Sequence, residues 1–386
     1  MKLGVIAHSI ETAEDYRKAG IARYTTAIID AFCDLAADEF HVFMMPDAPV
    51  PEKWSRAKNV VIHRIWRRYQ KWMQFPASIA IRSTGAKWSF SPSFRPPCRF
   101  IPSLPFVKRS VMIHDLFPLT HPHFFNDETR GYFDAVLPDA CNNAELLFAN
   151  SESTKSEILR LFGGNADRIV VTPLGPGNVI EQRPYEEISG AELESAGVPF
   201  KRFFFTLSTI EPRKNLPKLI QGLAILRENA EFGDVGLAIG GGKGWLYEEV
   251  FAEVERLGLQ DAVAFLGYVK TEALPALFGR CEAYVCASLT EGFGMPVLEA
   301  MIAGSPIVSS NGGSLPEVGG DIAIYFDPLN PEDIARALGE CLRSPAEREV
   351  WSQKSLERAR LFSWEKTARM TVDALRGASI RGRMDA

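Results

Sequence analysis

The sequence predicts an α/β protein of two similar-sized domains, each built around a parallel sheet, and three observations support this prediction. The chain has 386 residues, whereas a single domain usually takes about 100–200. Apolar strand-like runs alternate with helical patterns almost throughout, which is typical of βα units. A polar stretch with glycine and proline, residues 175–199, interrupts this alternation and predicts a linker with a short helix.

The first half is predicted to form a domain over residues 1–180. Apolar runs predict its strands at 3–7, 41–45, 60–65, 110–114, 145–150 and 168–172. Helical periodicity covers residues 21–36 and 153–162, and Ser151 or Ser153 suits the start of the second helix because a hydroxyl can cap its free N–H groups.

The second half is predicted to form a domain over residues 195–363. Its strands are expected at 202–207, 235–239, 263–266, 283–287, 306–309 and 322–325, and its helices at 215–229, 246–257, 271–278, 296–303 and 331–342. An amphipathic helix over 364–375 follows, and residues 376–386 are expected to fray. The C-terminal segment from about 364 to 386 is expected to pack back on the first domain.

Composition and charge argue against several classes of function. The net charge of −5 disfavours a protein whose main partner is nucleic acid, because phosphate binding needs a basic face. The six cysteines form no C-x-x-C pair and no zinc-site spacing, so reduced, buried thiols in a cytosolic protein and no metal site are expected; they are Cys33, Cys98, Cys141, Cys281, Cys286 and Cys341. No signal peptide is recognised, and no apolar run approaches the length of a membrane span.

The segment 291–299, with the sequence E-G-F-G-M-P-V-L-E, is the strongest functional signal. Glu291 follows a predicted strand, and Glu299 lies one turn inside the predicted helix. A carboxylate suits a vicinal diol because each of its oxygens can accept one hydroxyl. We therefore expect Glu291 to bind sugar hydroxyls and Glu299 to bind a ribose.

The residues between these glutamates predict an anion site. Gly292 and Gly294 permit tight backbone, and Pro296 suits the first turn of a helix. The backbone N–H groups of Phe293 and Met295 are then expected to point outward at the helix N-terminus, where anions bind.

Segment 291–299 looks like the E-x7-E motif of retaining GT-B glycosyltransferases, and in detail it resembles glycosyltransferase family 4. Residues 300–318 also match this family, and the resemblance extends more weakly over the first half. It implies two Rossmann-like domains facing a deep cleft, with the nucleotide-sugar donor on the C-terminal domain and the acceptor on the N-terminal one. By the resemblance, Gly312 and Gly313 would form a second loop near the donor sugar and diphosphate. The local sequence alone, Gly-Gly before S-L-P-E, predicts either a plain turn or a loop into a capped helix.

Two adjacent cations open the predicted helix after strand 202–207. Basic residues are slightly unfavourable at a helix start, so Arg213 and Lys214 make sense there if an anion lies against them. In the family, an arginine and a lysine from this loop neutralise the leaving diphosphate. Lys214 matches that lysine well. The commoner family arginine lies earlier, where this chain has Thr209, so we expect Arg213 to supply the charge and Thr209 to line the donor site.

The glycine-rich loop G-G-G-K-G at residues 240–244 is not a Walker A loop, because glycine follows its lysine where serine or threonine is required. In the family this loop lies by the nucleotide, which implies donor contact for Gly241, and the segment 265–269 lies near the base, which implies contact for Tyr268 and Val269. Direct ligand contact and an ordinary βα turn are left open.

The first half offers three further candidates. Gly20 and Arg23 resemble the family's glycine-rich first loop, which reaches the donor phosphate and the acceptor; helix capping is the alternative. His114 ends an apolar strand, and strand carboxyl ends face the ligand in open α/β sheets. Family members often place a histidine there against the donor sugar, although a lone histidine can also be structural.

A basic aromatic run, W-R-R-Y-Q-K-W-M-Q-F at residues 66–75, suits either a membrane interface with an anionic lipid-linked acceptor or a solvated segment with partly buried tryptophans. We favour the second interpretation and leave peripheral membrane contact open.

The resemblance implies a retaining hexosyltransferase that moves a mannose- or glucose-type sugar from a GDP- or UDP-linked donor to a saccharide or lipid-linked acceptor, in cell-surface polysaccharide or glycolipid synthesis. Fixed cations can replace a metal at the leaving group, so neither a metal nor a cofactor is expected. A cytoplasmic location is expected, with the inner face of the membrane left open. The alternatives are a non-catalytic nucleotide-sugar binder and another GT-B enzyme such as an epimerase. No pair of flanking carboxylates expected of a glycosidase is recognised.

Overall fold

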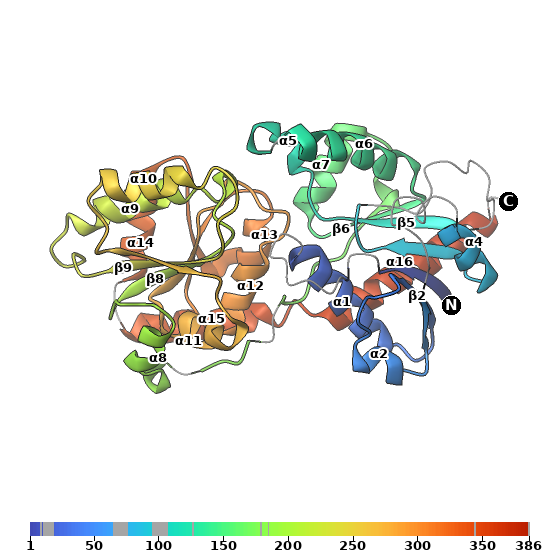
Figure 1. The fold of residues 1–386 in the computed structure, drawn as a ribbon, viewed down its shortest axis with the longest axis horizontal. Helices are drawn as coiled ribbons and strands as arrows, with labels where there is room; N and C mark the ends of the chain where they lie inside the picture. Colours follow the sequence, from blue (N-terminus) through green and yellow to red (C-terminus); the bar gives the residue numbers. More distant parts are fainter. Residues whose placement is uncertain are drawn as a thin grey trace. The chain divides into compact units, whose positions relative to one another are not determined.

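The computed structural model describes residues 1–7, 10, 19–64, 76–94, 107–125, 127–177, 180–183, 185–342 and 345–384. The chain divides into two compact units (Figure 1): unit 1 comprises residues 1–177 with 363–386, and unit 2 comprises residues 178–362. Each unit contains one parallel sheet with helices packed around it. The predicted α/β class with two Rossmann-like domains is therefore confirmed.

Unit 1 has a seven-stranded sheet in the order β3-β2-β1-β4-β5-β6-β7, and each strand runs parallel to its neighbours. Its strands are β1 Lys2–Ile6, β2 Glu39–Met44, β3 Val60–Arg64, β4 Trp88–Ser91, β5 Lys108–Ile113, β6 Leu146–Ala149 and β7 Ile169–Val171. Its helices are α1 Ala19–Cys33, α2 Glu52–Arg56, α4 Pro76–Ser83, α5 Phe117–Thr120, α6 Asp127–Asn143, α7 Glu152–Phe162 and α16 Trp364–Met384. Ser151 caps α7 by accepting from the Thr154 N–H at 3.0 Å.

Strand β4 was not predicted, although it lies at the centre of the sheet. In its sequence W-S-F-S, aromatic residues alternate with serine, which is typical of a loop rather than of a buried central strand. Ser89 and Ser91 are nevertheless buried, and backbone carbonyls accept from both hydroxyls: Ser89 donates to the Lys108 carbonyl at 3.4 Å, and Ser91 donates to the Ser93 carbonyl at 3.0 Å. Small hydroxyls can occupy a buried strand when such partners exist. Helix α6 was also missed, because Pro138 lies inside it and interrupts the helical pattern.

Unit 2 has a six-stranded parallel sheet in the order β10-β9-β8-β11-β12-β13. Its strands are β8 Phe203–Leu207, β9 Gly236–Gly240, β10 Val263–Gly267, β11 Ala283–Cys286, β12 Ile307–Ser310 and β13 Ala323–Phe326. Its helices are α8 Gly190–Ser195, α9 Leu216–Arg227, α10 Glu248–Arg256, α11 Leu274–Arg280, α12 Met295–Ile302, α13 Leu315–Gly319, α14 Pro331–Cys341 and α15 Pro345–Ala359. These elements agree with the predicted alternation, and α15 is additional.

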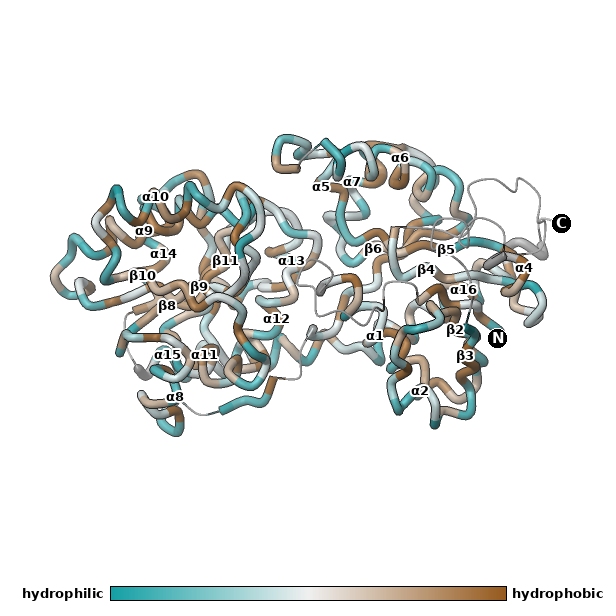
Figure 2. Tube along the Cα trace, viewed as in Figure 1, coloured by the Kyte–Doolittle hydropathy of each residue, from teal (hydrophilic) through white to brown (hydrophobic). Residues whose placement is uncertain are grey.

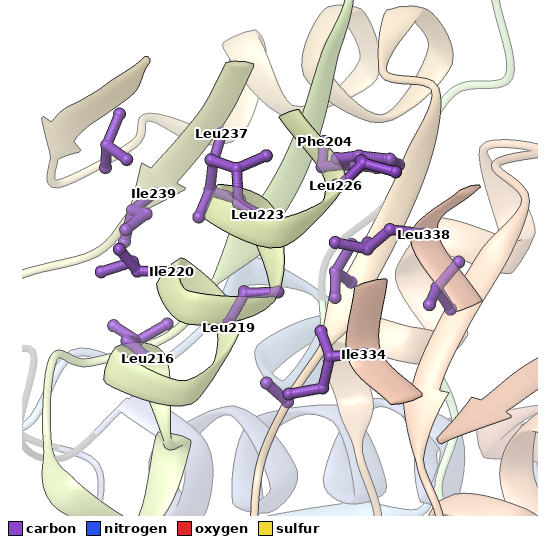
Figure 3. Close-up of a cluster of buried hydrophobic side chains, with 14 of the residues drawn as sticks. Phe204, Leu216, Leu219, Ile220, Leu223, Leu226, Leu237, Ile239, Ile334 and Leu338 are labelled. Atoms are coloured by element: carbon purple, nitrogen blue, oxygen red, sulfur yellow. The ribbon is translucent and has the colours of Figure 1, made fainter. Parts of the chain in front are cut away.

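The main core of unit 2 lies between the sheet and the helices α9 and α14. Figure 3 shows Leu223 of α9 beside Leu237 of β9, and Leu219 of α9 on the side of the helix toward Ile334 of α14; all four are buried. Gly222 lets the helices approach, since a Cβ there would lie 2.5 Å from a methyl of Ile334. Figure 2 shows hydrophobic residues concentrated along central strands that include β5, β6, β8 and β9. This close packing positions the strands of unit 2 and therefore the loops that follow them.

The C-terminal helix corrects one prediction. Residues 376–386 were expected to fray, but α16 continues to residue 384 because it is anchored to unit 1. Arg376 makes two contacts with the Asp38 carboxylate, at 2.7 and 2.8 Å, and Trp88 donates to the Ser379 hydroxyl at 2.8 Å. These partners lie far away in sequence, so a local pattern could not reveal them.

Candidate active site

The candidate site lies at the carboxyl edge of the unit 2 sheet, where the loops after β8, β9, β11 and β12 are joined by backbone hydrogen bonds. The loop after β8 is bonded to the loops after β9 and β11. Its Ile210 N–H donates to the Gly242 carbonyl at 2.9 Å, and its Arg213 carbonyl accepts from the Leu289 N–H at 2.9 Å. The loop after β12 is bonded to the loop after β11, because the Ser314 N–H donates to the Glu291 carbonyl at 3.0 Å. Four loops thus form one connected surface at the edge where open α/β sheets bind ligands.

A cluster of ion pairs occupies the centre of this surface. The Lys214 ammonium lies 2.6 Å from Oε1 of Glu291, and the Arg213 guanidinium lies 2.8 Å from Oε2 of the same carboxylate. The three side chains are only 13–15% exposed. The tertiary structure therefore brings together the three unit 2 residues that the sequence predicted as catalytic.

Two residues of this cluster were not predicted. Glu211 is buried and accepts from Nε and Nη2 of Arg213 at 3.2 and 2.9 Å, while Nη1 donates to the Thr290 carbonyl at 2.9 Å. The Ser288 hydroxyl donates to Oε1 of Glu291 at 2.7 Å. The only sequence signal was position: Glu211 precedes Arg213 by two residues, and Ser288 directly follows the apolar run of β11.

Opposing effects set the protonation state of Glu291. Burial raises the pKa of its carboxyl, but the charges of Arg213 and Lys214 and the hydrogen bonds from Lys214 and Ser288 outweigh burial and lower the pKa to about 2. The carboxylate is therefore ionised at any pH near neutrality, with both oxygens engaged by donors.

The paired glycines after β12 fit closely against the Glu291 loop. A Cβ on Gly312 would lie 2.2 Å from the Leu289 carbonyl oxygen, and one on Gly313 would lie 2.4 Å from that of Glu291. Gly313 also has a φ of +59°, which favours glycine. The loop leads into α13, but the predicted hydroxyl cap is wrong: the Ser314 hydroxyl donates to the Glu291 carbonyl at 2.9 Å instead of capping the helix.

The remainder of segment 291–299 forms a helix entrance. Gly294 precedes α12 with a φ of +98°, so the chain turns sharply after Gly292 and Phe293 and enters the helix at Met295 and Pro296. Glu299 lies one turn inside and is buried. The segment thus has the predicted loop-to-helix structure.

The other unit 2 candidates lie around the same edge. Gly241 has a φ of +132°, and its Cβ would lie 1.9 Å from the Ser208 carbonyl oxygen beside Thr209. Val269 packs over Gly240, since a Cβ there would lie 2.8 Å from a Val269 methyl. Tyr268 extends into solvent with 70% of its surface exposed. The ion pairs of the cluster are formed by other residues, Glu211, Arg213, Lys214 and Glu291.

Two of the predicted unit 1 residues, Gly20 and Arg23, lie in the first turns of α1. The third, His114, directly follows β5, where its Nε2 donates to the Pro92 carbonyl at 2.8 Å. Its ring also packs edge-on against that of Tyr24, with the centroids 4.8 Å apart. The aromatic run at 66–75 lies outside the described residues.

Comparisons with known proteins identify the family. The model of the family "Glycosyl transferases group 1" matches residues 195–358. The O-antigen chain mannosyltransferase B of Escherichia coli is 33% identical over 270 residues, which span 69% of this chain and 70% of that protein. The chain belongs to the group 1 glycosyltransferases. The serotype-specific mannosyltransferase WbdA of Escherichia coli is 28% identical over 272 residues, which span 69% of this chain and only 33% of that longer protein.

Solved structures share the fold along nearly the whole chain. HepE from Anabaena, in complex with UDP and glucose, aligns over 98% of this chain and 100% of its own with a TM-score of 0.68 and 18% identity. WaaG, a glycosyltransferase involved in lipopolysaccharide biosynthesis, aligns over 96% and 98% with a TM-score of 0.67 and 13% identity. This group 1 glycosyltransferase therefore has the predicted GT-B fold.

The family match covers the whole ion-pair cluster of this glycosyltransferase, because Glu211, Arg213, Lys214, Ser288 and Glu291 all lie within residues 195–358. The three unit 1 candidates lie outside it. Within the described ranges, no group of three or more His, Cys, Asp or Glu side chains is placed to hold a metal ion. None of the helices described is long and apolar enough to cross a membrane.

The half-buried histidine of this glycosyltransferase, His114, yields a prediction about pH. Burial lowers the pKa of His114 from 6.5 to about 4, although its hydrogen bond to Pro92 partly opposes this. Between these two values the unfolded chain binds a proton that the folded chain excludes. The contribution of neutral His114 to stability is thus complete above pH 6.5 and is lost as the pH falls towards 4.

We expect the melting temperature of the wild type to fall more steeply over this window than that of His114→Gln, as measured by circular dichroism. The exposed His123 offers a control, and His123→Gln should follow the wild type. Burial also lowers the pKa values of His41 and His63, but these act equally in all three proteins. If the melting temperatures of His114→Gln and the wild type fall equally between pH 6.5 and 4, the prediction is wrong.

Proposed function

We propose that this group 1 glycosyltransferase is a retaining, metal-independent member of glycosyltransferase family 4 that transfers a hexose from a nucleoside diphosphate sugar to a saccharide or lipid-linked acceptor. GDP-mannose is the favoured donor, since the O-antigen chain mannosyltransferase B and WbdA are both named as mannosyltransferases; UDP-hexoses are the second choice. The proposed setting is cell-surface polysaccharide or glycolipid synthesis at the cytoplasmic face of a membrane.

The ion-pair cluster is the observation that carries this proposal. Separating a sugar from a nucleoside diphosphate leaves negative charge on the diphosphate, and fixed cations stabilise that charge as it develops. Arg213 and Lys214 lie at the carboxyl edge of the sheet, and Glu211 and the Thr290 carbonyl hold the guanidinium in place. We assign both cations to the leaving diphosphate, in the role that a metal ion serves elsewhere.

The remaining candidates are assigned around this centre. Glu291 binds hydroxyls of the transferred sugar, and Glu299 binds the ribose. The backbone of the helix entrance and of the paired-glycine loop borders the sugar and diphosphate, and the loops after β8, β9 and β10 border the nucleoside. Gly20, Arg23 and His114 of unit 1 are assigned to binding of the donor phosphate, donor sugar and acceptor.

Retention is proposed to proceed by attack on the front face of the sugar, assisted by the leaving phosphate. A double displacement would need a carboxylate that is free to attack carbon. Glu291 does not suit that role, because Arg213, Lys214 and Ser288 engage both of its oxygens and its pKa of about 2 makes it a weak base.

A donor screen tests the proposal. The protein is incubated with GDP-mannose, GDP-glucose, UDP-glucose and UDP-galactose, with and without mannose oligosaccharides and a lipid-linked mannoside, in the presence of EDTA. We expect release of GDP from GDP-mannose with EDTA present and an α-linked product by NMR. Tight nucleotide binding without sugar release from any donor would favour the non-catalytic binder, and a β-linked product would contradict retention.

A further inference from the structure

We infer that Glu291 has a second role as the resident anion of the diphosphate site: an incoming nucleoside diphosphate displaces its carboxylate from Arg213 and Lys214, and its return promotes product release. The inference rests on the proposed function for the identity of the ligand. It adds an exchange step that the assignment of Glu291 as a sugar-binding residue does not contain.

The charge balance of the cluster is the first argument. Arg213 and Lys214 contribute two positive charges, and Glu211 and Glu291, which contact them directly, contribute two negative charges. A diphosphate that approached this arrangement would meet a cluster without net charge. It would also meet the ionised Glu291 itself, whose repulsion is strong in a partly buried site. Binding with the ion pairs unchanged is therefore unfavourable.

The hydrogen bonds are the second argument. All three guanidinium nitrogens of Arg213 are engaged, by Glu211, by the Thr290 carbonyl and by Glu291. The Lys214 ammonium is engaged by Glu291. A phosphate oxygen can gain a charge-assisted hydrogen bond from these groups when it replaces an anion already bound there.

The two carboxylates differ in how easily they can leave. Glu211 is buried and binds Nε and Nη2 of Arg213, so it orients the guanidinium. Glu291 binds the remaining nitrogen and lies directly before Gly292 and Gly294, in a turn where Gly294 adopts a φ of +98°. Because Glu211 engages two guanidinium nitrogens and Glu291 engages only one, Glu291 is the carboxylate that an incoming anion displaces from Arg213.

Protonation does not open the cluster, because the pKa of Glu291 is about 2 and its carboxyl stays charged near neutral pH. A competing anion is therefore required. The same exchange runs in reverse after transfer: when the sugar has left, Glu291 competes with the diphosphate for both cations and lowers the affinity for the product.

Calorimetric titration with GDP and with UDP tests the exchange. We expect Glu291→Gln to bind the nucleoside diphosphate about tenfold more tightly than the wild type, because the competing charge is gone, while sugar transfer falls. Glu253→Gln is the matched control. Glu253 has a similar exposed fraction of 12% and lies 2.6 Å from Arg256 on α10, outside the cluster. The Glu253→Gln protein should therefore bind GDP and UDP with the affinity of the wild type.

A second variant tests the exchange if melting curves show that Glu291→Gln does not fold. Ser288→Ala removes the hydroxyl that holds Oε1 of Glu291 at 2.7 Å while retaining the carboxylate, and it should bind GDP or UDP two- to threefold more tightly, on the order of one modest hydrogen bond. Raising the salt concentration should reduce the difference in affinity between Glu291→Gln and the wild type, because ions screen the repulsion between the Glu291 carboxylate and the diphosphate.

The outcomes separate this inference from the proposed function. If the wild type transfers sugar and binds the nucleoside diphosphate, but folded Glu291→Gln and Ser288→Ala bind it no more tightly, the exchange is wrong and the proposed function stands. If the wild type neither binds GDP or UDP nor releases sugar from any donor, the proposed function is wrong and the exchange falls with it.

Discussion

Replacing Lys214 with alanine should lower the rate of sugar transfer by about a thousandfold, which is the upper range for removing one fixed donor from a developing negative charge. The Lys214 ammonium is one of two cations in the cluster, and its contact with Glu291 at 2.6 Å holds it at the carboxyl edge of the sheet. Its loss also leaves the Glu291 carboxylate with one cation fewer. The effect should appear mainly in kcat, because charge builds on the diphosphate as the bond to the sugar breaks.

Lys218→Ala is the matched control for this measurement. Lys218 lies on α9 one turn beyond the cluster, and its ammonium contacts Gln221 at 3.1 Å. This variant should retain wild-type kcat and KM in the same nucleotide-release assay. Full transfer activity in a folded Lys214→Ala protein would contradict the assigned role of the lysine at the diphosphate.

Replacing Gly241 with alanine should destabilise unit 2 by about 3 kcal/mol and abolish most transfer, since a forbidden backbone conformation and a steric clash add together. Gly241 has a φ of +132°, and its Cβ would lie 1.9 Å from the Ser208 carbonyl oxygen. The loop after β8 would have to move, and this loop continues into Arg213 and Lys214. Melting by circular dichroism, together with the nucleotide-release assay, measures both effects.

The adjacent glycine supplies the control. A Cβ on Gly242 would meet no atom within 4 Å, so Gly242→Ala should melt within a few degrees of the wild type and retain activity. Equal behaviour of the two variants would show that the close approach of the loops after β8 and β9 does not matter for the site.

Several elements show where local pattern is sufficient and where it fails. The apolar strands of unit 2 and the helices between them were predicted because each repeats a pattern over its own length. Strand β4 was missed because serine is buried in it, and the length of α16 was misjudged because Asp38 and Trp88 hold its end. The hydroxyl of Ser314 was expected to cap a helix, yet it binds a loop from another strand.

The sequence by itself determined the class of fold, the family and the list of residues with relevant chemistry, because these depend on periodicity and on motifs whose members are close neighbours in the chain. Only the tertiary structure decided that Lys214 and Glu291, which are 77 residues apart, form an ion pair, and that Glu211 and Ser288 belong to the same cluster. The physical reason is that parallel strands bring the loops at their carboxyl ends together irrespective of separation in sequence. Contacts between those loops, and the charge balance that they produce, have no local pattern in the amino-acid sequence by which they could be predicted.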